Sequence, residues 1–302
     1  MNASHDTEKY IGRFAPSPTG PVHFGTLVAA VGSYLQAQTN NGEWLLRIDD
    51  VDTTRKVEGA DVDIISTLEA FGFQWSGDIL YQTEMTDAYE AALDELIEQS
   101  MVFPCLCSRK QLAQAGAGAG AGNIYPGTCR SRQLPESKEH SLRPITEDIT
   151  ITFDDIVMGK QTQNIKTECG DFIIKRRDGL FAYQLAVVVD DAIQNITEVV
   201  RGTDLLDSTP RQIYLQQLLG YPTPAYCHLP LAVDPAGNKI SKSEGKSKIE
   251  IAHREELLIS SLDFLGQQVP GALSGSGIED IWQWAMDNWD VARIPTSKTI
   301  PL

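Results

Sequence analysis

Hydrophobic and polar positions in the first hundred residues switch between two spacings, which predicts strands alternating with helices. The segment 10–15 has the pattern of a short strand, and the next segment has helical spacing until Asn40-Asn41-Gly42 ends it. A buried strand is expected at 44–48, and two further helices follow. The apolar positions that mark the three helices are Leu27, Val28, Val31, Tyr34 and Leu35, then Ile64, Ile65, Leu68 and Phe71, then Tyr89, Ala92, Leu93, Leu96 and Ile97. This β-α-β-α order predicts an α/β fold with a parallel, doubly wound sheet.

The pattern changes after residue 101. A cysteine-rich segment is followed by an Ala/Gly run at 115–122, which predicts a flexible loop, and by a polar stretch to residue 148. Short strands are expected at 149–153 and 172–175. We therefore predict an inserted subdomain over 102–182, placed between a first half of the sheet (8–101) and a second half (183–235).

The second half has strongly apolar runs. Val187-Val188-Val189 and Glu198-Val199-Val200 have the composition of central strands, a helix is expected at 209–219, and another strand at 229–233. The remainder, 236–302, contains a lysine-rich loop and then a tail with helical spacing.

Composition narrows the class of protein. The 302 residues are 42% hydrophobic, and no apolar run is long enough to span a membrane. The polar N-terminus has no signal-peptide pattern, which predicts a cytoplasmic protein, and five cysteines in such a chain do not indicate a disulfide framework. The 25 Lys and Arg against 41 Asp and Glu give a formal charge of -16, so RNA would have to bind through a local patch.

Two segments have the composition of phosphate- or carboxylate-binding sites. The segment 13–26 lies where a strand turns into a helix, at the sheet edge where ligands of α/β proteins bind, although a plain Pro-rich loop fits equally well. The segment 238–247 contains Lys239 and Lys242 with serines between them, which suits a polyphosphate; the alternative is a solvated basic loop. Its Gly245-Lys246-Ser247 is not the end of a P-loop, because that motif needs glycine where Ile240 stands.

Together, these segments resemble the two signatures of class I aminoacyl-tRNA synthetases. Pro16–Thr26 is similar to the "HIGH" signature, with His23 and Thr26 at its first and last positions, and Lys239–Ser243 is similar to "KMSKS". The opening Arg-Phe-Ala-Pro-Ser-Pro-Thr-Gly resembles the glutamyl/glutaminyl branch. The resemblance covers about residues 10–265 and includes segments 47–52, Tyr183, 189–191 and 201–205. It implies a Rossmann-like class I catalytic domain with a small zinc-bearing insert and a short helical C-terminal tail.

A short paralogue family within this branch is more similar still. Only about sixty residues follow the lysine loop, so we expect no anticodon-binding domain. Cys105-x-Cys107 followed by Tyr125-x-x-x-Cys129 resembles the zinc site of the glutamyl-queuosine tRNA(Asp) synthetases. That family activates glutamate and attaches it to the queuosine base in the anticodon of tRNA(Asp).

The resemblance implies roles for individual residues. Arg13 and Arg201 would bind the carboxylates of glutamate, Tyr183 would hydrogen-bond it, and Asp49, where the family usually has Glu, would hold its ammonium. Residues that complete the glutamate pocket would be Phe14, Ala15, Pro16 and Ser17. ATP would be bound by His23, Gly25, Thr26 and Lys242. The catalytic residues would be His23 and Thr26, which hold the phosphates, and Lys242 with Lys239, which stabilise the transition state.

Plainer interpretations remain open for these residues. Arg201 could form a structural salt bridge with Asp204 or Glu198, and the acids Asp49, Asp50 and Asp52 could belong to a solvated turn after a strand.

The cysteines have two interpretations. Three thiolates at Cys105, Cys107 and Cys129 suit Zn²⁺, whereas the alternative is ordinary core thiols. Tyr125 as a further ligand rests on the resemblance alone. Cys169 and Cys227 belong to no ligand pattern and are interpreted as structural.

Three functional hypotheses follow. The first is a monomeric, ATP-dependent ligase that forms glutamyl-adenylate from L-glutamate and Mg-ATP without needing tRNA. It then transfers the glutamyl group to queuosine in tRNA(Asp). The second is a truncated glutamyl-tRNA synthetase that charges the 3′ end of tRNA(Glu), and the third is an inactive paralogue that acts as a binding module. For the first, the RNA phosphates would be bound by Arg130, Arg132, Lys246 and Lys248; the alternative for these four residues is ordinary surface charge.

Overall fold

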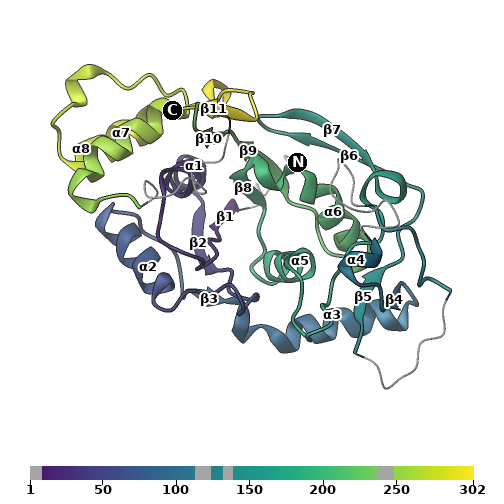
Figure 1. The fold of residues 1–302 in the computed structure, drawn as a ribbon. Helices are drawn as coiled ribbons and strands as arrows, with labels where there is room; N and C mark the ends of the chain where they lie inside the picture. Colours follow the sequence, from purple (N-terminus) through teal and green to yellow (C-terminus); the bar gives the residue numbers. More distant parts are fainter. Residues whose placement is uncertain (1–8, 113–123, 132–138, 236, 238–247) are drawn as a thin grey trace, which may run out of the picture.

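The structure is a computed structural model that describes residues 9–112, 124–131, 139–235, 237 and 248–302 (Figure 1). Its strands are β1 (Ile11–Phe14), β2 (Glu43–Ile48), β3 (Leu80–Tyr81), β4 (Val102–Cys105), β5 (Ser141–Pro144), β6 (Thr150–Asp155), β7 (Gly159–Asn164), β8 (Glu198–Gly202), β9 (Ala225–Leu229), β10 (Leu231–Val233) and β11 (Thr299–Pro301). Its helices are α1 (Phe24–Thr39), α2 (Ala60–Ala70), α3 (Thr86–Glu98), α4 (Arg109–Leu112), α5 (Tyr183–Ile193), α6 (Thr209–Leu218), α7 (Arg254–Phe264) and α8 (Ile278–Asn288).

A parallel sheet forms the centre of the molecule. Strands β1, β2 and β3 pair in parallel, as do β8 and β9. The two groups meet where the backbone N–H of Thr197 donates to the carbonyl of Ile11 at 2.9 Å, so β8 lies beside β1. The order β3-β2-β1 therefore continues as β8-β9-β6-β7, and the strand order reverses between β1 and β8. This is the predicted doubly wound arrangement.

Helices cover both faces of this sheet (Figure 1). One apolar cluster joins the sheet to α1, α2, α7 and α8, and the other joins it to α3, α5 and α6. Successive side chains of a strand point to opposite faces, so Val200 packs into the first cluster and Val199 into the second. Among the described helices, none is long and apolar enough to cross a membrane.

Helix α1 begins and ends where the sequence predicts. His23 caps its first turn, because its Nδ1 accepts from the backbone N–H of Thr26. The helix stops before Asn40-Asn41-Gly42, where Asn41 has a φ of 53°. A Cβ at Gly42 would lie 2.5 Å from the carbonyl oxygen of Tyr10, so only glycine fits between this turn and β1.

The helical tail packs on helix α1 and on the residues that follow α2. Trp282 of α8 forms edge-to-face contacts with Tyr34 and Phe73, and its Nε1 donates to the carbonyl of Phe71 at 2.8 Å. Burying such rings contributes several kcal/mol of hydrophobic free energy, on the order of 2–3 kcal/mol per ring. The tail is therefore part of the same apolar core as α1 and α2.

The segment after residue 101 contributes two antiparallel pairs. Strands β4 and β5 pair with each other, and β6 and β7 form a hairpin. The end of that hairpin also pairs in parallel with β9, at Asp155 opposite Tyr226. Part of the predicted insert thus extends the central sheet.

Two sequence predictions of strands are wrong. Val187-Val188-Val189 lies in the middle of helix α5, where all three side chains are buried. A short apolar run fits a buried helix as well as a buried strand, so spacing alone could not separate them. In the segment 172–175, only Lys175 makes isolated β-bridges. The strand predicted at 229–233 is interrupted at Pro230, which separates β9 from β10. The Ala/Gly run at 115–122 lies outside the described residues.

Candidate active site and metal centre

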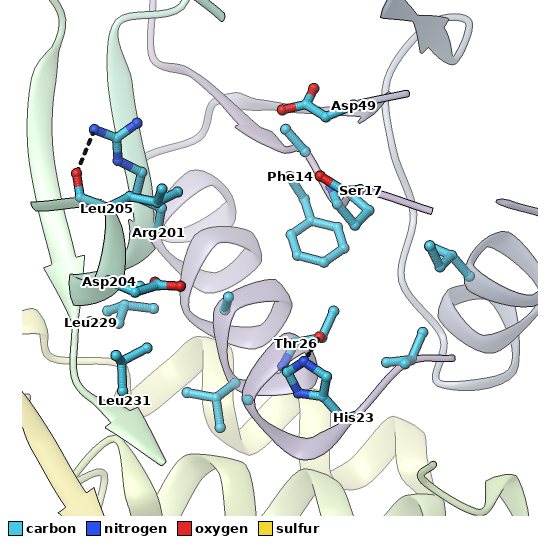
Figure 2. A pocket seen from close by; sticks show the side chains of 18 of the residues that line it. Phe14, Ser17, His23, Thr26, Asp49, Arg201, Asp204, Leu205, Leu229 and Leu231 are labelled. Carbon is cyan, nitrogen blue, oxygen red and sulfur yellow. Dashed lines mark hydrogen bonds between the residues drawn. The ribbon is translucent and has the colours of Figure 1, made fainter. Parts of the chain in front are cut away.

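A pocket of about 490 Å³ opens at the carboxyl ends of β1 and β8. This is the point where the strand order reverses, which is the usual ligand site of doubly wound sheets. The turn after β1 and the first turn of α1 form one wall, and β8 with the segment after it forms another. In Figure 2, Arg201, Asp49 and the neighbouring pair His23 and Thr26 lie on different elements around this pocket.

The pocket gathers the predicted site residues that the structure describes. They come from segments that are up to 188 positions apart in the sequence, since Arg13 and Arg201 both line it. The predicted residues among its lining are Arg13, Phe14, Ala15, Pro16, Ser17, His23, Gly25, Thr26, Asp49, Tyr183 and Arg201.

The side chain of Arg13 is fixed by a hydrogen bond to a buried acid, Asp191. Its Nε donates to Asp191 Oδ1 at 3.1 Å, and the side chain is buried. In the described part of the chain, its two terminal nitrogens have no other hydrogen-bond partner. A guanidinium fixed through Nε can use these two nitrogens to bind one carboxylate in a bidentate manner.

Asp49 is held by a buried arginine that carries no predicted role. Arg47 Nε donates to Asp49 Oδ1 at 2.8 Å, and Arg47 Nη1 donates to Asp191 Oδ1 at 2.7 Å. Burial raises the pKa of Asp49 above its ordinary value, against the opposing effect of Arg47. Burial also acts on Asp191, but Arg13 and Arg47 outweigh it and lower the pKa of that carboxyl. Arg47 therefore connects the acid and the arginine that face the pocket.

Arg201 is fixed by four partners. Its Nε donates to His228 Nε2 at 3.1 Å, and its Nη2 donates to Thr209 Oγ1 at 2.8 Å and to the carbonyl of Leu205 at 3.4 Å. Its Nη1 donates to the hydroxyl of Tyr183 at 3.3 Å. The Tyr183 hydroxyl accepts this bond, so its own proton can be donated to a ligand.

The N-terminus of α1 faces the same pocket. The ring of His23 contacts Thr26 twice, through Nδ1 to the backbone N–H at 3.2 Å and through Nε2 to Oγ1 at 3.1 Å. The first turn of a helix carries unpaired N–H groups and partial positive charge, which favour a phosphate. A side chain at Gly25 would approach the His23 ring to 3.3 Å, so glycine keeps this turn open.

The structure tests the plainer interpretations of the acids after β2 and of Arg201. The acids Asp49 and Asp50 are buried rather than in a solvated turn, and Asp50 accepts from Thr83 and pairs with Lys56 at 2.9 Å. Asp52 pairs with Arg176 at 2.9 Å. For Arg201 the close partners are His228, Thr209 and Tyr183, instead of an ion pair with Glu198, whose carboxylate accepts from the Tyr10 hydroxyl.

Part of the predicted site lies outside the described residues. This applies to Lys239 and Lys242 of the lysine loop, and to Arg132 and Lys246 among the cations expected to contact RNA. The other two cations already have acidic partners. Arg130 forms a two-pronged pair with Asp171, and Lys248 pairs with Asp63 at 2.8 Å.

The structure brings the three predicted thiols together. The Sγ atoms of Cys105, Cys107 and Cys129 lie within 4.8 Å of one another, and Cys107 and Cys129 are 3.6 Å apart. The Tyr125 hydroxyl lies 3.5 Å from Cys105 Sγ and 3.6 Å from Cys107 Sγ. Four ligands around a tetrahedral Zn²⁺ with Zn–S bonds of ~2.3 Å would be roughly 3.8 Å apart. The cluster therefore has the spacing of a metal centre.

Two buried residues beside the pocket were not predicted at all. His228 lies on β9 next to Arg201, and Asp155 at the end of β6 pairs with it. A single sequence gives one faint signal, namely a histidine that interrupts the apolar run 226–231. The two acids at 190–191 and Arg47 were part of the resemblance, but nothing in their spacing indicated that they meet.

Comparison with known proteins was made on the whole chain. Residues 10–262 match the family described as "tRNA synthetases class I (E and Q), catalytic domain". The chain is 50% identical to a protein of Dechloromonas aromatica named Glutamyl-Q tRNA(Asp) synthetase, over 97% of this chain and 98% of that one. It is 48% identical to a protein of the same name from Aromatoleum aromaticum, over 95% of this chain and 90% of that one.

Solved structures agree on the fold. The chain superimposes on a glutamate tRNA ligase from Elizabethkingia meningosepticum with a TM-score of 0.79 at 23% identity. The match covers 96% of this chain and 66% of that one, so the chain spans about two thirds of the solved ligase. The α/β architecture with its parallel sheet is thus that of a class I synthetase catalytic domain.

Proposed function

The chain belongs to the class I tRNA synthetases for glutamate and glutamine, and from this premise we propose that it activates L-glutamate with ATP and transfers it to the queuosine base of tRNA(Asp). One observation carries the proposal. Relatives named Glutamyl-Q tRNA(Asp) synthetase match this chain at 48% and 50% identity along nearly their entire length. At that identity, extended over both chains, the pocket and its chemistry are expected to be shared.

The charges of the pocket match those of glutamate. The substrate has two carboxylates and one ammonium, and the pocket offers two arginines and one acid. Arg13 and Arg201 bind the carboxylates, Tyr183 donates its hydroxyl proton to one of them, and Asp49 Oδ2 accepts from the ammonium. Asp49 Oδ1 is already occupied by Arg47, which leaves the second oxygen for the substrate. The turn Phe14-Ala15-Pro16-Ser17 closes the side of the glutamate site.

ATP occupies the part of the pocket beside α1. His23, Gly25, Thr26 and the N-terminus of the helix hold its phosphates, with Mg²⁺ entering as part of the nucleotide substrate. A carboxylate oxygen of glutamate bonds to the α-phosphorus while the bond from that phosphorus to pyrophosphate breaks. Lys242, with Lys239, stabilises the charge of this transition state, so the protein contributes positioning and electrostatics. A hydroxyl of queuosine then attacks the glutamyl carbonyl, and AMP leaves.

The distribution of charge along the chain favours an RNA contact that is limited to the inserted subdomain. Residues 102–182 contain 11 Lys and Arg against 9 Asp and Glu, whereas the rest of the chain contains 14 against 32. A polyanion is repelled by most of this surface and least by the insert. We therefore infer that the inserted subdomain (102–182) lies against the RNA, and that the body formed by 8–101, 183–235 and 236–302 carries out the chemistry. We further propose that the protein works as a monomer in the cytoplasm, where its three substrates occur.

The thiol cluster is proposed to hold one structural Zn²⁺. The ligands are Cys105, Cys107 and Cys129, with the Tyr125 hydroxyl in fourth position. When bound, the ion would join the end of β4, which carries Cys105, to the turn that carries Tyr125 and Cys129.

Purified protein is expected to contain one zinc per chain, and Cys129→Ser is expected to lose most of it. Cys169→Ser is the matched control, because Cys169 is also buried but lies outside the cluster. Metal analysis by mass spectrometry measures both. Wild-type protein that holds no zinc, without exposure to chelator, would contradict this proposal.

The test of the proposed function is glutamate-dependent exchange of pyrophosphate into ATP. The exchange is expected with glutamate alone, because the described residues proposed for glutamate and for the ATP phosphates line one pocket. Exchange that begins only when tRNA is added would favour a truncated glutamyl-tRNA synthetase. No exchange under either condition would favour an inactive paralogue.

A further inference from the structure

A row of three buried polar side chains crosses three neighbouring strands behind the pocket. Arg201 of β8 is in direct register with His228 of β9, and Asp155 closes the row from β6. His228 Nδ1 and Asp155 Oδ2 are 2.6 Å apart, and Arg201 Nε is 3.1 Å from His228 Nε2. His228 is fully buried, with its ring stacked on that of Tyr226.

The hydrogen bonds of this row define the protonation of the histidine. Asp155 accepts from the backbone N–H groups of Val157, Met158 and His228 as well as from the ring, and its pKa lies below the ordinary value. A guanidinium can only donate, so His228 Nε2 must accept from Arg201. His228 is therefore a neutral imidazole with its proton on Nδ1. Burial lowers its pKa, in agreement with this state.

Neutral His228 affects the pocket because its Nε2 can accept a hydrogen bond from Arg201, a side chain that can adopt many rotamers. A long guanidinium side chain loses rotamer entropy when it is fixed, so a pre-organised arginine binds a carboxylate more tightly than a mobile one. The acceptor at His228 Nε2 holds the Nε end, while Thr209 and Tyr183 hold the terminal nitrogens. The remaining N–H of Nη1 and the Tyr183 hydroxyl are then left for the ligand.

We propose that His228 is a positioning residue for amino-acid binding, which acts as a neutral acceptor that fixes the Arg201 guanidinium, with Asp155 setting its tautomer. The proposal rests on the proposed function, because it assumes that Arg201 binds a carboxylate of glutamate. It adds a link from the hairpin of the insert, through β9, to the substrate pocket. A core histidine with no effect on the ligand is the alternative.

Two substitutions at the same position separate these alternatives. In His228→Gln, the side-chain oxygen reaches the place of Nε2 and can still accept from Arg201. In His228→Asn, the shorter amide reaches only the place of Nδ1, so it keeps the bond to Asp155 and loses the acceptor. Both replace the ring by an amide, so both lose the stacking on Tyr226.

The measured quantity is KM for glutamate in tRNA-free pyrophosphate exchange. His228→Asn is expected to raise it by about tenfold or more, the effect of losing a hydrogen bond to a charged group, with KM for ATP changed less than about threefold. His228→Gln is expected to stay within about threefold of wild type. In an Arg201→Ala background, His228→Asn is expected to raise KM no further, since the two residues act as a unit. The exposed His253→Asn serves as the surface control.

Equal KM values in the Asn and Gln variants, or values of both within twofold of wild type, would overturn the proposal. If His228→Asn does not fold, Asp155→Asn replaces it. The amide introduced at position 155 can donate to His228 Nδ1, so the ring proton moves to Nε2. Nε2 can then no longer accept from Arg201, and the same rise in KM is expected. An active wild type with unchanged variants refutes only this inference, whereas a wild type without glutamate-dependent exchange refutes the proposed function as well.

Discussion

Arg47→Met is expected to lower the free energy of unfolding by about 3–5 kcal/mol, the usual effect of removing one partner from a buried ionic cluster. Arg47 is fully buried and contacts Asp49 and Asp191 through hydrogen bonds, with Asp190 at 3.7 Å. Methionine fills a similar volume without charge. It would leave Asp49 and Asp190 without a cation, and Asp191 with Arg13 alone.

Urea unfolding followed by circular dichroism measures this change. Arg55→Met is the matched control, because Arg55 is exposed and its pair with Asp52 is weak. The control is expected to change stability by less than about 0.5 kcal/mol. A loss below about 1 kcal/mol in Arg47→Met would mean that the three acids do not depend on this arginine.

Lys242→Ala is expected to reduce the rate of adenylate formation by roughly 10²–10³-fold, the usual effect of removing one preorganised charge partner from a transition state. The charge that Lys242 balances develops on the phosphates during the reaction. KM for glutamate is therefore expected to change little, since the amino acid is held by Arg13 and Arg201.

Single-turnover measurement of adenylate formation tests this prediction. Lys160→Ala is the control, because Lys160 is an exposed lysine on β7. A Lys242→Ala rate within about twofold of wild type would mean that the lysine loop is an ordinary solvated surface.

Sequence reasoning was most accurate where local chemistry decides the structure. The turn after β1, the stop of α1 at Asn40-Asn41-Gly42 and the helical tail follow from residues close in sequence. The continuous apolar run Val187-Val188-Val189 predicts a central strand, yet these residues lie in helix α5, which packs against both α3 and α6. Tertiary contacts determine the secondary structure of this segment, and these contacts could not be predicted from a single sequence.

The pocket residues proposed to contact the substrate could be predicted from motifs. The residues that fix those side chains through hydrogen bonds could not. Arg13, Asp49 and Arg201 belong to recognisable segments, and all three line the pocket. The residues that fix these side chains are paired across long separations in the sequence. Arg47 and Asp191 are 144 positions apart, and Asp155 and His228 are 73 apart. Pairing at these separations depends on strand order, which the sequence predicts only in outline.

The identity of the glutamyl acceptor is measured by one labelling experiment. The protein is incubated with radioactive glutamate, ATP and, separately, tRNA(Asp) with queuosine, tRNA(Asp) without queuosine, and tRNA(Glu). We predict label only on the queuosine-containing tRNA(Asp), and we predict that it survives removal of the 3′-terminal adenosine. Label on tRNA(Glu) that disappears with the terminal adenosine would contradict the account.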